Sequence, residues 1–186
     1  MTDDGGFETW LPLAQAGDER AAGLIFRAYQ PYLLRYLRAQ EPRVADDLAA
    51  EVWVAAAAAL RVFEGDESGF RSWLFTVARR RIIEHRRKGL RRRTDPVSPE
   101  LLEEVTDDRD PGDRAASTVD AERAIELMSE HLSPDQTEVL ILRVVADLTA
   151  AQVAELMGHT EAWVRLTQHR ALKRLAAHMD RPLEVA

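Results

Sequence analysis

Apolar residues recur at intervals of three and four along nearly the whole chain, and no segment shows the alternation of a half-buried strand. This spacing is typical of helices that bury one face. It predicts a helix from Arg20 to about Arg38, capped by Asp18 and broken or kinked near Pro31. A second helix is expected from about Val44 to Val62. The pattern therefore predicts an all-α fold.

A third predicted helix changes character along its length. It is expected to begin after Ser68 and Gly69, and its first half carries a set of apolar residues on one face, namely Phe70, Trp73, Leu74, Val77 and Ala78. The next stretch, 79–93, contains nine basic residues and one acidic residue. Cations at this density repel one another, and neutralisation by nucleic-acid phosphates would relieve the repulsion. A membrane-surface helix and a surface for an acidic protein are the alternatives.

Three start signals indicate helices in the C-terminal part of the chain. The loosest is Ser117–Asp120. The stronger two are Ser133–Gln136, with proline at the first helical position, and Thr149–Gln152. Gly158 is expected to end the helix that Thr149 starts, and Thr160 is expected to cap a last helix that reaches about His178.

Residues 149–171 have the spacing of a helix-turn-helix. Ala154 is small where two helices would cross, Gly158 accepts the backbone angles of a sharp turn, and Val164 would pack the second helix onto the first. That helix could then enter the major groove with an outward face made of Glu161, Arg165, Leu166, His169 and Arg170, beside a partly exposed Trp163. An ordinary antiparallel helix pair with a solvated basic face is the alternative.

Charge divides the chain into two parts joined by an acidic segment. The net charge is −5 over residues 1–78, +8 over 79–93, −8 over 94–122 and −2 over 123–186, which sums to −7. The acidic segment also contains three prolines and no sustained helical pattern. We therefore expect a domain over 1–93, a flexible acidic linker over 94–116 and a helix-turn-helix domain over 117–186. The linker is also a candidate internal partner that masks residues 79–93.

Composition and charge narrow the range of functions that the chain can have. The 186 residues are 46% hydrophobic and 31% charged, as in an ordinary globular protein, and the net charge restricts nucleic-acid contact to local patches. No cysteine, bilayer-length apolar run or signal peptide is evident, which favours the cytoplasm. The five histidines are scattered, and neither a phosphate loop nor a nucleophile is evident. We therefore expect no enzyme, no metal site and no cofactor.

Taken together, these segments resemble the extracytoplasmic-function (ECF) sigma factors of bacterial RNA polymerase over nearly the whole chain. Residues 20–93 look like sigma region two, where Asp46–Trp53 resembles the Asp-Leu/Val-x-Gln-Glu-x-Phe element and Phe70–Arg79 the Phe-x-x-Trp-Leu…Ala-Arg stretch. Residues 120–178 look like region four, where Leu148–Ala171 is similar to the family's helix-turn-helix signature. The resemblance implies a factor that brings core RNA polymerase to a set of promoters.

The resemblance also implies roles for individual residues. Binding to the β′ clamp helices of core polymerase would involve Asp46, Asp47, Leu48, Glu51, Val52 and Trp53. Binding to the melted minus-ten strand, beside a base pocket at 64–69, would involve Phe70, Arg71, Trp73, Arg79, Arg80, Arg81, Arg86 and Arg87. Binding to the duplex minus-thirty-five element would involve Arg143, Thr160, Glu161, Trp163, Arg165, Leu166, His169, Arg170 and Lys173. The β subunit flap and an anti-sigma factor are further implied partners.

The sequence departs from the family pattern at several of these positions. Ala50 replaces the usual glutamine of the polymerase-binding element, and Arg80 stands where asparagine is common. Leu166–Thr167 replaces a Ser-Arg pair, and Ala162–Trp163 replaces Gly-Thr. Ala50 removes one possible polar contact of the polymerase-binding element, whereas the other changes affect base contacts. All of them leave the fold expectation intact. A free-standing helix-turn-helix regulator and a protein-binding adaptor are the competing functions.

Overall fold

The computed structural model describes residues 5–94, 123, 125, 127, 128 and 130–179, and the regular elements in these residues are helical. They are α1 (Phe7–Gln15), α2 (Glu19–Gln40), the 3-10 turn η1 (Pro42–Val44), α3 (Ala45–Leu60), α4 (Glu67–Thr94), α6 (Pro134–Leu140), the π-helical η2 (Ile141–Val145), α7 (Ala150–Met157) and α8 (Glu161–Met179). The all-α prediction is confirmed. Apart from Thr94, the expected linker and the start signal Ser117–Asp120 lie outside the described residues.

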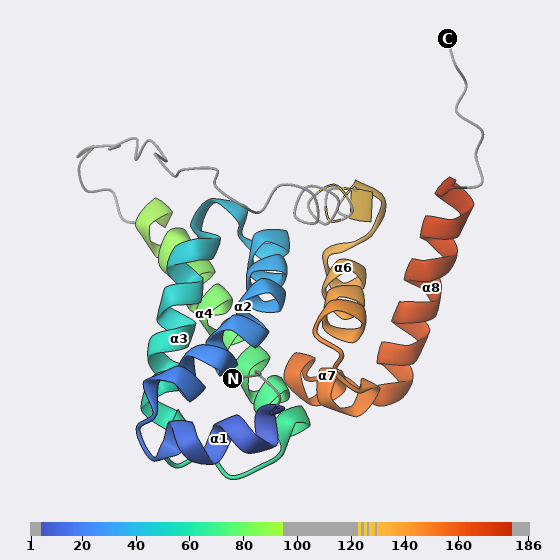
Figure 1. Cartoon of the computed structure of the whole chain (residues 1–186). Helices are drawn as coiled ribbons and strands as arrows, with labels where there is room; N and C mark the ends of the chain where they lie inside the picture. The colour runs from blue at the N-terminus through green and yellow to red at the C-terminus, as the bar shows by residue number, and fades with distance from the viewer. Residues whose placement is uncertain (1–4, 95–122, 124, 126, 129, 180–186) are drawn as a thin grey trace.

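Helices α1 to α4 pack around an apolar core (Figure 1). Asp18 caps α2 as predicted, because its carboxylate accepts hydrogen bonds of 2.8 and 3.0 Å from the first backbone N–H groups. Pro31 does not break α2, so the predicted break is wrong. Tyr29 before the proline and Leu33 after it are buried in the same core. Tertiary packing therefore outweighs the local preference of proline.

Two features of this bundle differ from the sequence expectation. Helix α1 is short, contains a proline and has no clear sequence signal, yet it is anchored by Phe7, whose ring centroid lies 5.0 Å from that of Phe70. Helix α4 begins at Glu67, earlier than expected. The carboxylate of Asp66 accepts a hydrogen bond from the backbone N–H of Gly69 at 2.7 Å and so stabilises the first turn.

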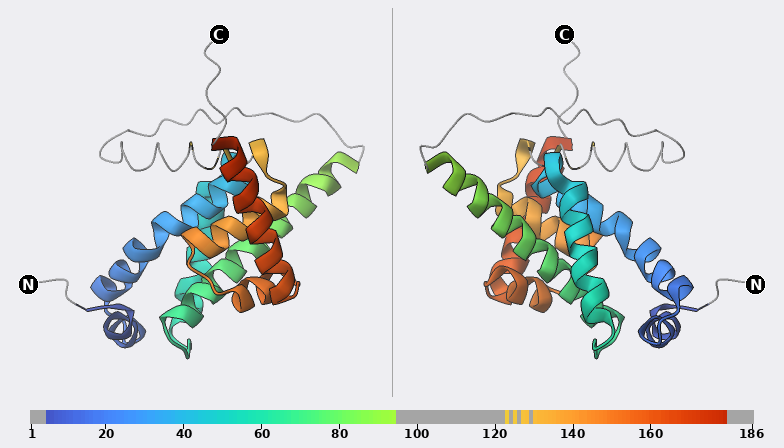
Figure 2. Two further views of the ribbon diagram at one scale, coloured as in Figure 1. Left: turned by 90° about the vertical axis from the view of Figure 1, so that its right-hand side faces the viewer. Right: turned by 90° about the vertical axis from the view of Figure 1, so that its left-hand side faces the viewer.

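The helices α6, α7 and α8 lie beside the first four (Figure 1). We call α1–α4 the N-terminal half and α6–α8, with η2, the C-terminal half. Helix α2 contacts α6 and η2, and α4 contacts α7. One core cluster continues through both halves and includes Tyr36, Phe75, Ile141, Leu142 and Leu148. The C-terminal end of α4 projects beyond the other helices (Figure 2).

The predicted helix signals from Ser133 to Thr160 are confirmed. Ser133 and Thr149 each form a capping box with the glutamine three residues later. Gly158 ends α7 with a φ of 73°, in the left-handed region that favours glycine. The hydroxyl of Thr160 accepts a hydrogen bond from the backbone N–H of Trp163 at 3.2 Å, as a cap of α8 requires.

The backbone between α6 and α7 is irregular. After the π-helical η2, Asp147 has a φ of 52°, which few residues other than glycine, asparagine and aspartate adopt. The backbone N–H of Leu148 then donates to the carbonyl of Leu142 at 3.0 Å. This turn brings the carboxylate of Asp147 to α4.

Candidate nucleic-acid interface

The C-terminal end of α4 presents cations to solvent. Arg80, Arg86, Arg87 and Lys88 are exposed. The C-terminal end of α4 projects from the bundle (Figure 2). Arg86 is positioned from α2, because its Nε lies 2.5 Å from Glu41 Oε1 and its Nη2 donates to the carbonyl of Gln40 at 3.1 Å. This end of α4 can therefore meet phosphates along an open surface.

The aromatic start of α4 lies beneath the surface. Phe70 is fully buried, and its ring centroid lies 5.2 Å from Tyr29, 5.5 Å from Phe63 and 5.9 Å from the half-buried Trp73. Phe70 thus supports the neighbouring residues from the core, in contrast to the direct DNA contact that the resemblance implies. The loop expected to form a base pocket at 64–69 is also shorter, since its last three residues belong to α4.

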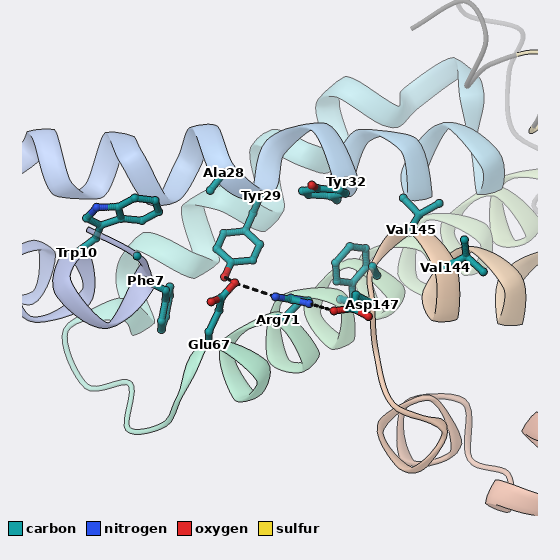
Figure 3. Close-up of a pocket in the computed structure, with 13 residues that line it drawn as sticks. Phe7, Trp10, Ala28, Tyr29, Tyr32, Glu67, Arg71, Val144, Val145 and Asp147 are labelled. Atoms are coloured by element: carbon teal, nitrogen blue, oxygen red, sulfur yellow. Dashed lines mark hydrogen bonds and ion pairs between the residues drawn. The ribbon is translucent and has the colours of Figure 1, made fainter. Parts of the chain in front are cut away.

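Arg71 joins α4 to the C-terminal half (Figure 3). Its Nη1 donates to Asp147 Oδ2 at 2.7 Å and its Nη2 donates to Glu67 Oε1 at 2.8 Å. The hydroxyl of Tyr29 donates to the same Glu67 oxygen at 3.0 Å. Burial works against the charge of Arg71, but the hydrogen bonds to the two carboxylates outweigh it and raise its pKa. In this conformation Arg71 is engaged by protein carboxylates.

A second charged contact between the halves is more deeply buried. Arg79 Nε donates to Glu138 Oε1 at 3.1 Å, and the hydroxyl of Tyr36 donates to the same oxygen at 2.8 Å. Tyr36 is fully buried and Glu138 is 9% exposed. Burial, together with the charge of Glu138, raises the pKa of Tyr36 well above its ordinary value.

No motif or periodicity in the sequence singles out Tyr36, Glu138 or Asp147. Their polar partners across the two halves lie at least 59 positions away in the chain. Asp147 directly precedes Leu148 and Thr149, at the start of the helix-turn-helix. An acidic residue at that position is also typical of a solvated loop, so it does not predict an ion pair.

The expected polymerase-binding residues lie on two faces of helix α3. Asp46, Asp47 and Glu51 are exposed, whereas Leu48 and Val52 are buried. Trp53 is half-buried, and its Nε1 donates to Gln30 Oε1 at 2.5 Å. Val54 is 73% exposed beside this acidic face. The buried residues fix the helix, and the exposed ones form a mixed acidic and apolar surface.

Helices α7 and α8 form the predicted helix-turn-helix, with Ala154 and Val164 buried where they meet. The residues expected on the outer face of α8 are exposed, with Trp163 half-buried: Glu161, Arg165, Leu166, His169, Arg170 and Lys173. The ring of His159 stacks on Trp163 with centroids 3.7 Å apart, a contact that the spacing does not predict. Arg165 forms an ion pair of 2.5 Å with Glu161 one turn earlier.

Arg143 belongs to η2 and is half-buried against α8. Its Nε donates to Gln168 Oε1 at 3.1 Å, and its Nη1 donates to the carbonyl of Leu148. These contacts fasten the irregular turn to α8. A direct contact of Arg143 with duplex DNA stays a prediction.

A cleft of about 490 Å³ lies between the halves, next to Arg71 (Figure 3). Its walls include Phe7, Trp10, Tyr29 and Tyr32 from the N-terminal half and residues 144–147 from the C-terminal half. Protein interiors are close-packed, so the cleft indicates that the halves pack incompletely at this point.

No helix among the described residues is long and apolar enough to cross a membrane. The same residues contain no group of three histidine, aspartate or glutamate side chains that could hold a metal ion.

Known sequences match both halves. Residues 25–93 match Sigma-70 region 2, and residues 122–175 match Sigma-70 region 4. The ECF RNA polymerase sigma factor ShbA of Streptomyces griseus is 33% identical, with 88% of this chain and 90% of that protein covered. The ECF RNA polymerase sigma factor SigD of Mycobacterium tuberculosis is 35% identical, with 87% and 78% covered.

Two solved structures share the fold. The sigma factor RpoE from Bartonella quintana, in complex with the anti-sigma factor NepR, matches with a TM-score of 0.62 and 22% identity over 86% of this chain and 98% of that one. CnrH in complex with the cytosolic domain of CnrY matches with a TM-score of 0.60 and 20% identity over 92% and 96%.

Proposed function

Because this chain belongs to the ECF RNA polymerase sigma factors of the sigma-70 family and directs transcription initiation, we propose that it binds one promoter through two separate surfaces. The observation that carries the proposal is the exposure of cations on two helices, the end of α4 and the outer face of α8, in different halves. A sigma factor is not an enzyme, so these surfaces act by binding alone.

The end of α4 binds the melted minus-ten strand in this proposal. Arg80, Arg81, Arg86 and Arg87 neutralise phosphates, which releases counterions and gives an affinity that falls with salt. Of these, Arg81 is ion-paired with Glu51 and Glu84, and Arg86 with Glu41, all within the N-terminal half. Arg71 and Arg79, which are bound by carboxylates of the C-terminal half, join them once those carboxylates withdraw. Trp73, supported by the buried Phe70, holds the loop before α4, where an unpaired base can stack.

The outer face of α8 reads the duplex minus-thirty-five element. Arg165 and Arg170 can each donate two hydrogen bonds to a guanine edge in the major groove, and Leu166 can contact a thymine methyl. Thr160, Glu161, Trp163, His169 and Lys173 border this face and contribute to positioning. Three of the α8 residues that depart from the family pattern, Ala162, Trp163 and Leu166, are at least partly exposed here, whereas Thr167 is buried. The promoter element read by this chain is therefore expected to differ from the family's usual one.

The exposed acidic face of α3 binds the β′ clamp helices of core polymerase. Asp46, Asp47 and Glu51 supply charge, Val54 supplies apolar area, and Trp53 is fixed beside them by Gln30. A mixed acidic and apolar face suits a helical partner with basic and apolar side chains. The β subunit flap is the corresponding partner for the C-terminal half.

The division into a region two domain over 1–93, an acidic linker over 94–116 and a region four domain over 117–186 belongs to the same proposal. The linker joins the two DNA-binding surfaces across the polymerase, where its charge suits a channel built for RNA. It is also the candidate mask for residues 79–93 in the free chain. Neutralising it at Glu103, Glu104, Asp107, Asp108 and Asp110 should then increase polymerase-independent DNA binding at low salt.

An anti-sigma factor is a further proposed partner. RpoE of Bartonella quintana, which shares the fold, forms a complex with the anti-sigma factor NepR. An inhibitor of this chain would act where polymerase and promoter act, and we place both in the cytoplasm.

Run-off transcription with purified core polymerase on a library of genomic promoters tests the proposed function. Adding the chain should give transcripts from a new set of start sites, and the triple variant Asp46→Asn, Asp47→Asn, Glu51→Gln should lose them together with binding to core polymerase. Tight binding of the chain alone to duplex promoters, without new transcripts, would instead establish the free-standing regulator.

A further inference from the structure

We infer that His159, held in place by Trp163, is a further DNA ligand of this chain and donates a hydrogen bond to a backbone phosphate beside the minus-thirty-five element. The inference rests on the proposed function, because it takes α8 as the helix that enters the duplex. Its new content is the ligand itself, together with the role of Trp163 as a positioning residue for that ligand.

The backbone fixes the starting point of both side chains. Gly158 ends α7 with a left-handed φ of 73°, and the backbone N–H of His159 then donates to the carbonyl of Ala154 at 2.9 Å. The backbone N–H of Trp163 donates to the hydroxyl of Thr160 at 3.2 Å. The turn and the cap of α8 therefore determine where the two rings meet.

The two rings form a stack with an inner and an outer member. Trp163 is half-buried and packs against the apolar core, whereas His159 is exposed. Their ring centroids lie 3.7 Å apart and their planes differ by 10°, so the imidazole covers one face of the indole. The outer ring, which is that of His159, is the one that a bound duplex can reach.

Stacking leaves the hydrogen-bonding groups of His159 available. The two nitrogens of an imidazole lie at the rim of the ring, so a neighbour on one face does not cover them. Among the residues that the structure describes, neither nitrogen has a hydrogen-bond partner. The ring is thus already oriented in the free chain, and a phosphate that binds it costs little additional side-chain entropy.

The place of His159 in the helix-turn-helix favours a phosphate as its acceptor. The first residues of the second helix meet base edges, so the turn just before them lies beside the sugar-phosphate backbone. The nearby carboxylate of Glu161 is paired with Arg165 at 2.5 Å, which offsets its repulsion of a phosphate. A phosphate contact fixes the register of the protein on the duplex and carries no sequence information.

Methylphosphonate scanning can identify such a contact. Each phosphate beside the minus-thirty-five element is replaced in turn by an uncharged methylphosphonate, and binding of the reconstituted holoenzyme is measured. The variant His159→Phe keeps a flat ring on Trp163 but has no ring nitrogen. The matched control is His178→Phe, because His178 is also exposed on α8 and its ring is also stacked, with its centroid 3.6 Å from that of His131.

We expect His159→Phe to weaken holoenzyme binding about tenfold, which is the size of one hydrogen bond to a charged acceptor. The loss should be similar at all promoter variants. Neutralising one particular phosphate should weaken the wild type and His178→Phe by about the same factor and leave His159→Phe unchanged. Equal binding by His159→Phe and the wild type, a loss confined to certain base pairs, or the same scan for all three proteins would overturn the inference.

Trp163→Leu tests the positioning role. Loss of the flat support should weaken binding about threefold, because the imidazole must then be ordered on binding, and Trp163→Phe should restore it. The scan should also lose sensitivity at the same phosphate in Trp163→Leu. A purely structural role would instead lower the free energy of unfolding in urea and leave the scan unchanged.

The wild-type protein separates this inference from the proposed function. A wild-type holoenzyme that selects no promoters would refute the proposed function and the inference together. Promoter selection by the wild type that is unaffected by His159→Phe would refute the inference alone.

Discussion

Helices α4 and α8 both carry arginines expected to meet DNA, but their surroundings differ. The described arginines of α8 point to solvent, and the ion pair of Arg165 stays within its own helix. Arg71 and Arg79 of α4 are instead bound by carboxylates from the other half of the molecule. The comparison teaches that similar cations can be solvated on one helix and held by carboxylates from the other half of the molecule on another.

The difference fits the two DNA forms. Duplex DNA presents its edges in a fixed geometry, so a rigid exposed helix suffices to read it. A melted strand exists only after polymerase has opened the duplex, so a surface for it gains from being available at that stage alone. The aromatic rings of Tyr29, Phe63 and Phe70 hold the start of α4 in place from within the N-terminal half.

The largest expected effect is on the free energy of unfolding, and it distinguishes the buried side of α4 from the outer face of α8. Phe70→Ala should lower the free energy of unfolding by about 3–5 kcal/mol, because Phe70 is fully buried among aromatic rings. Leu166→Ala, on the outer face of α8, should change it by less than about 0.5 kcal/mol. Urea unfolding followed by circular dichroism measures both. Similar losses for the two variants would show that the assignment of supporting and binding roles is mistaken.

The next effect sharpens the division of labour between the helices. Arg165→Ala should cost about 1–3 kcal/mol of holoenzyme binding at promoters with a guanine in the minus-thirty-five element, and little at others. Arg86→Ala should weaken holoenzyme binding at all promoters to a similar extent. It should also reduce the salt dependence of binding, as expected for a phosphate contact. Binding of reconstituted holoenzyme to a panel of promoter variants at several salt concentrations gives both readings. Parallel losses for the two variants across the panel would remove the distinction.

A smaller effect is expected at the turn between α7 and α8, which orients α8. Gly158→Ala should destabilise the C-terminal half by about 1–2 kcal/mol, because the φ of 73° is strained for any residue with a Cβ. Gly89→Ala in α4 is the control, since an added Cβ meets nothing within 4 Å there and alanine favours a helix. Thermal unfolding of the two variants should differ in sign.

The smallest expected effect is on the pH dependence of stability. It tests the buried contact between Tyr36 and Glu138. The pKa of Tyr36 is raised in the folded chain, so its contribution to stability is fully present below the ordinary tyrosine pKa of about 10 and is lost as pH rises above it. Tyr36→Phe should lower the free energy of unfolding by about 1 kcal/mol at neutral pH and flatten the decline at alkaline pH. Unfolding curves measured from neutral to alkaline pH test this, and an unchanged slope in the variant would argue against the buried phenol.

Local signals carried most of the fold prediction. The two capping boxes, Gly158 and the Ala154–Val164 spacing act within a few residues of each other, and the structure bears them out. The early start of α4 also had a local signal in Asp66, which the analysis of periodicity passed over. The expected break at Pro31 does not occur, because residues on both sides of the proline are buried in a core shared with other helices.

The site was predictable in outline only. The charge of 79–93 and the exposed face of α8 follow from sequence because they depend on one helix each. The pairing of Arg79 with Glu138 joins residues 59 positions apart, and that of Arg71 with Asp147 requires a π-helical turn that no periodicity indicates. Which cations are free and which are held is thus a property of the folded chain.

Site-specific photocross-linking of the holoenzyme tests most directly whether the two helices meet one promoter in different ways. A photoreactive amino acid at Lys88 in α4 or at Leu172 in α8, both exposed beside the proposed binding residues, would be activated on an end-labelled promoter after open-complex formation. The account predicts cross-links from Lys88 to the melted segment and from Leu172 to duplex DNA upstream of it. Cross-links from both positions to the same segment, or none from Lys88 in open complexes, would contradict it.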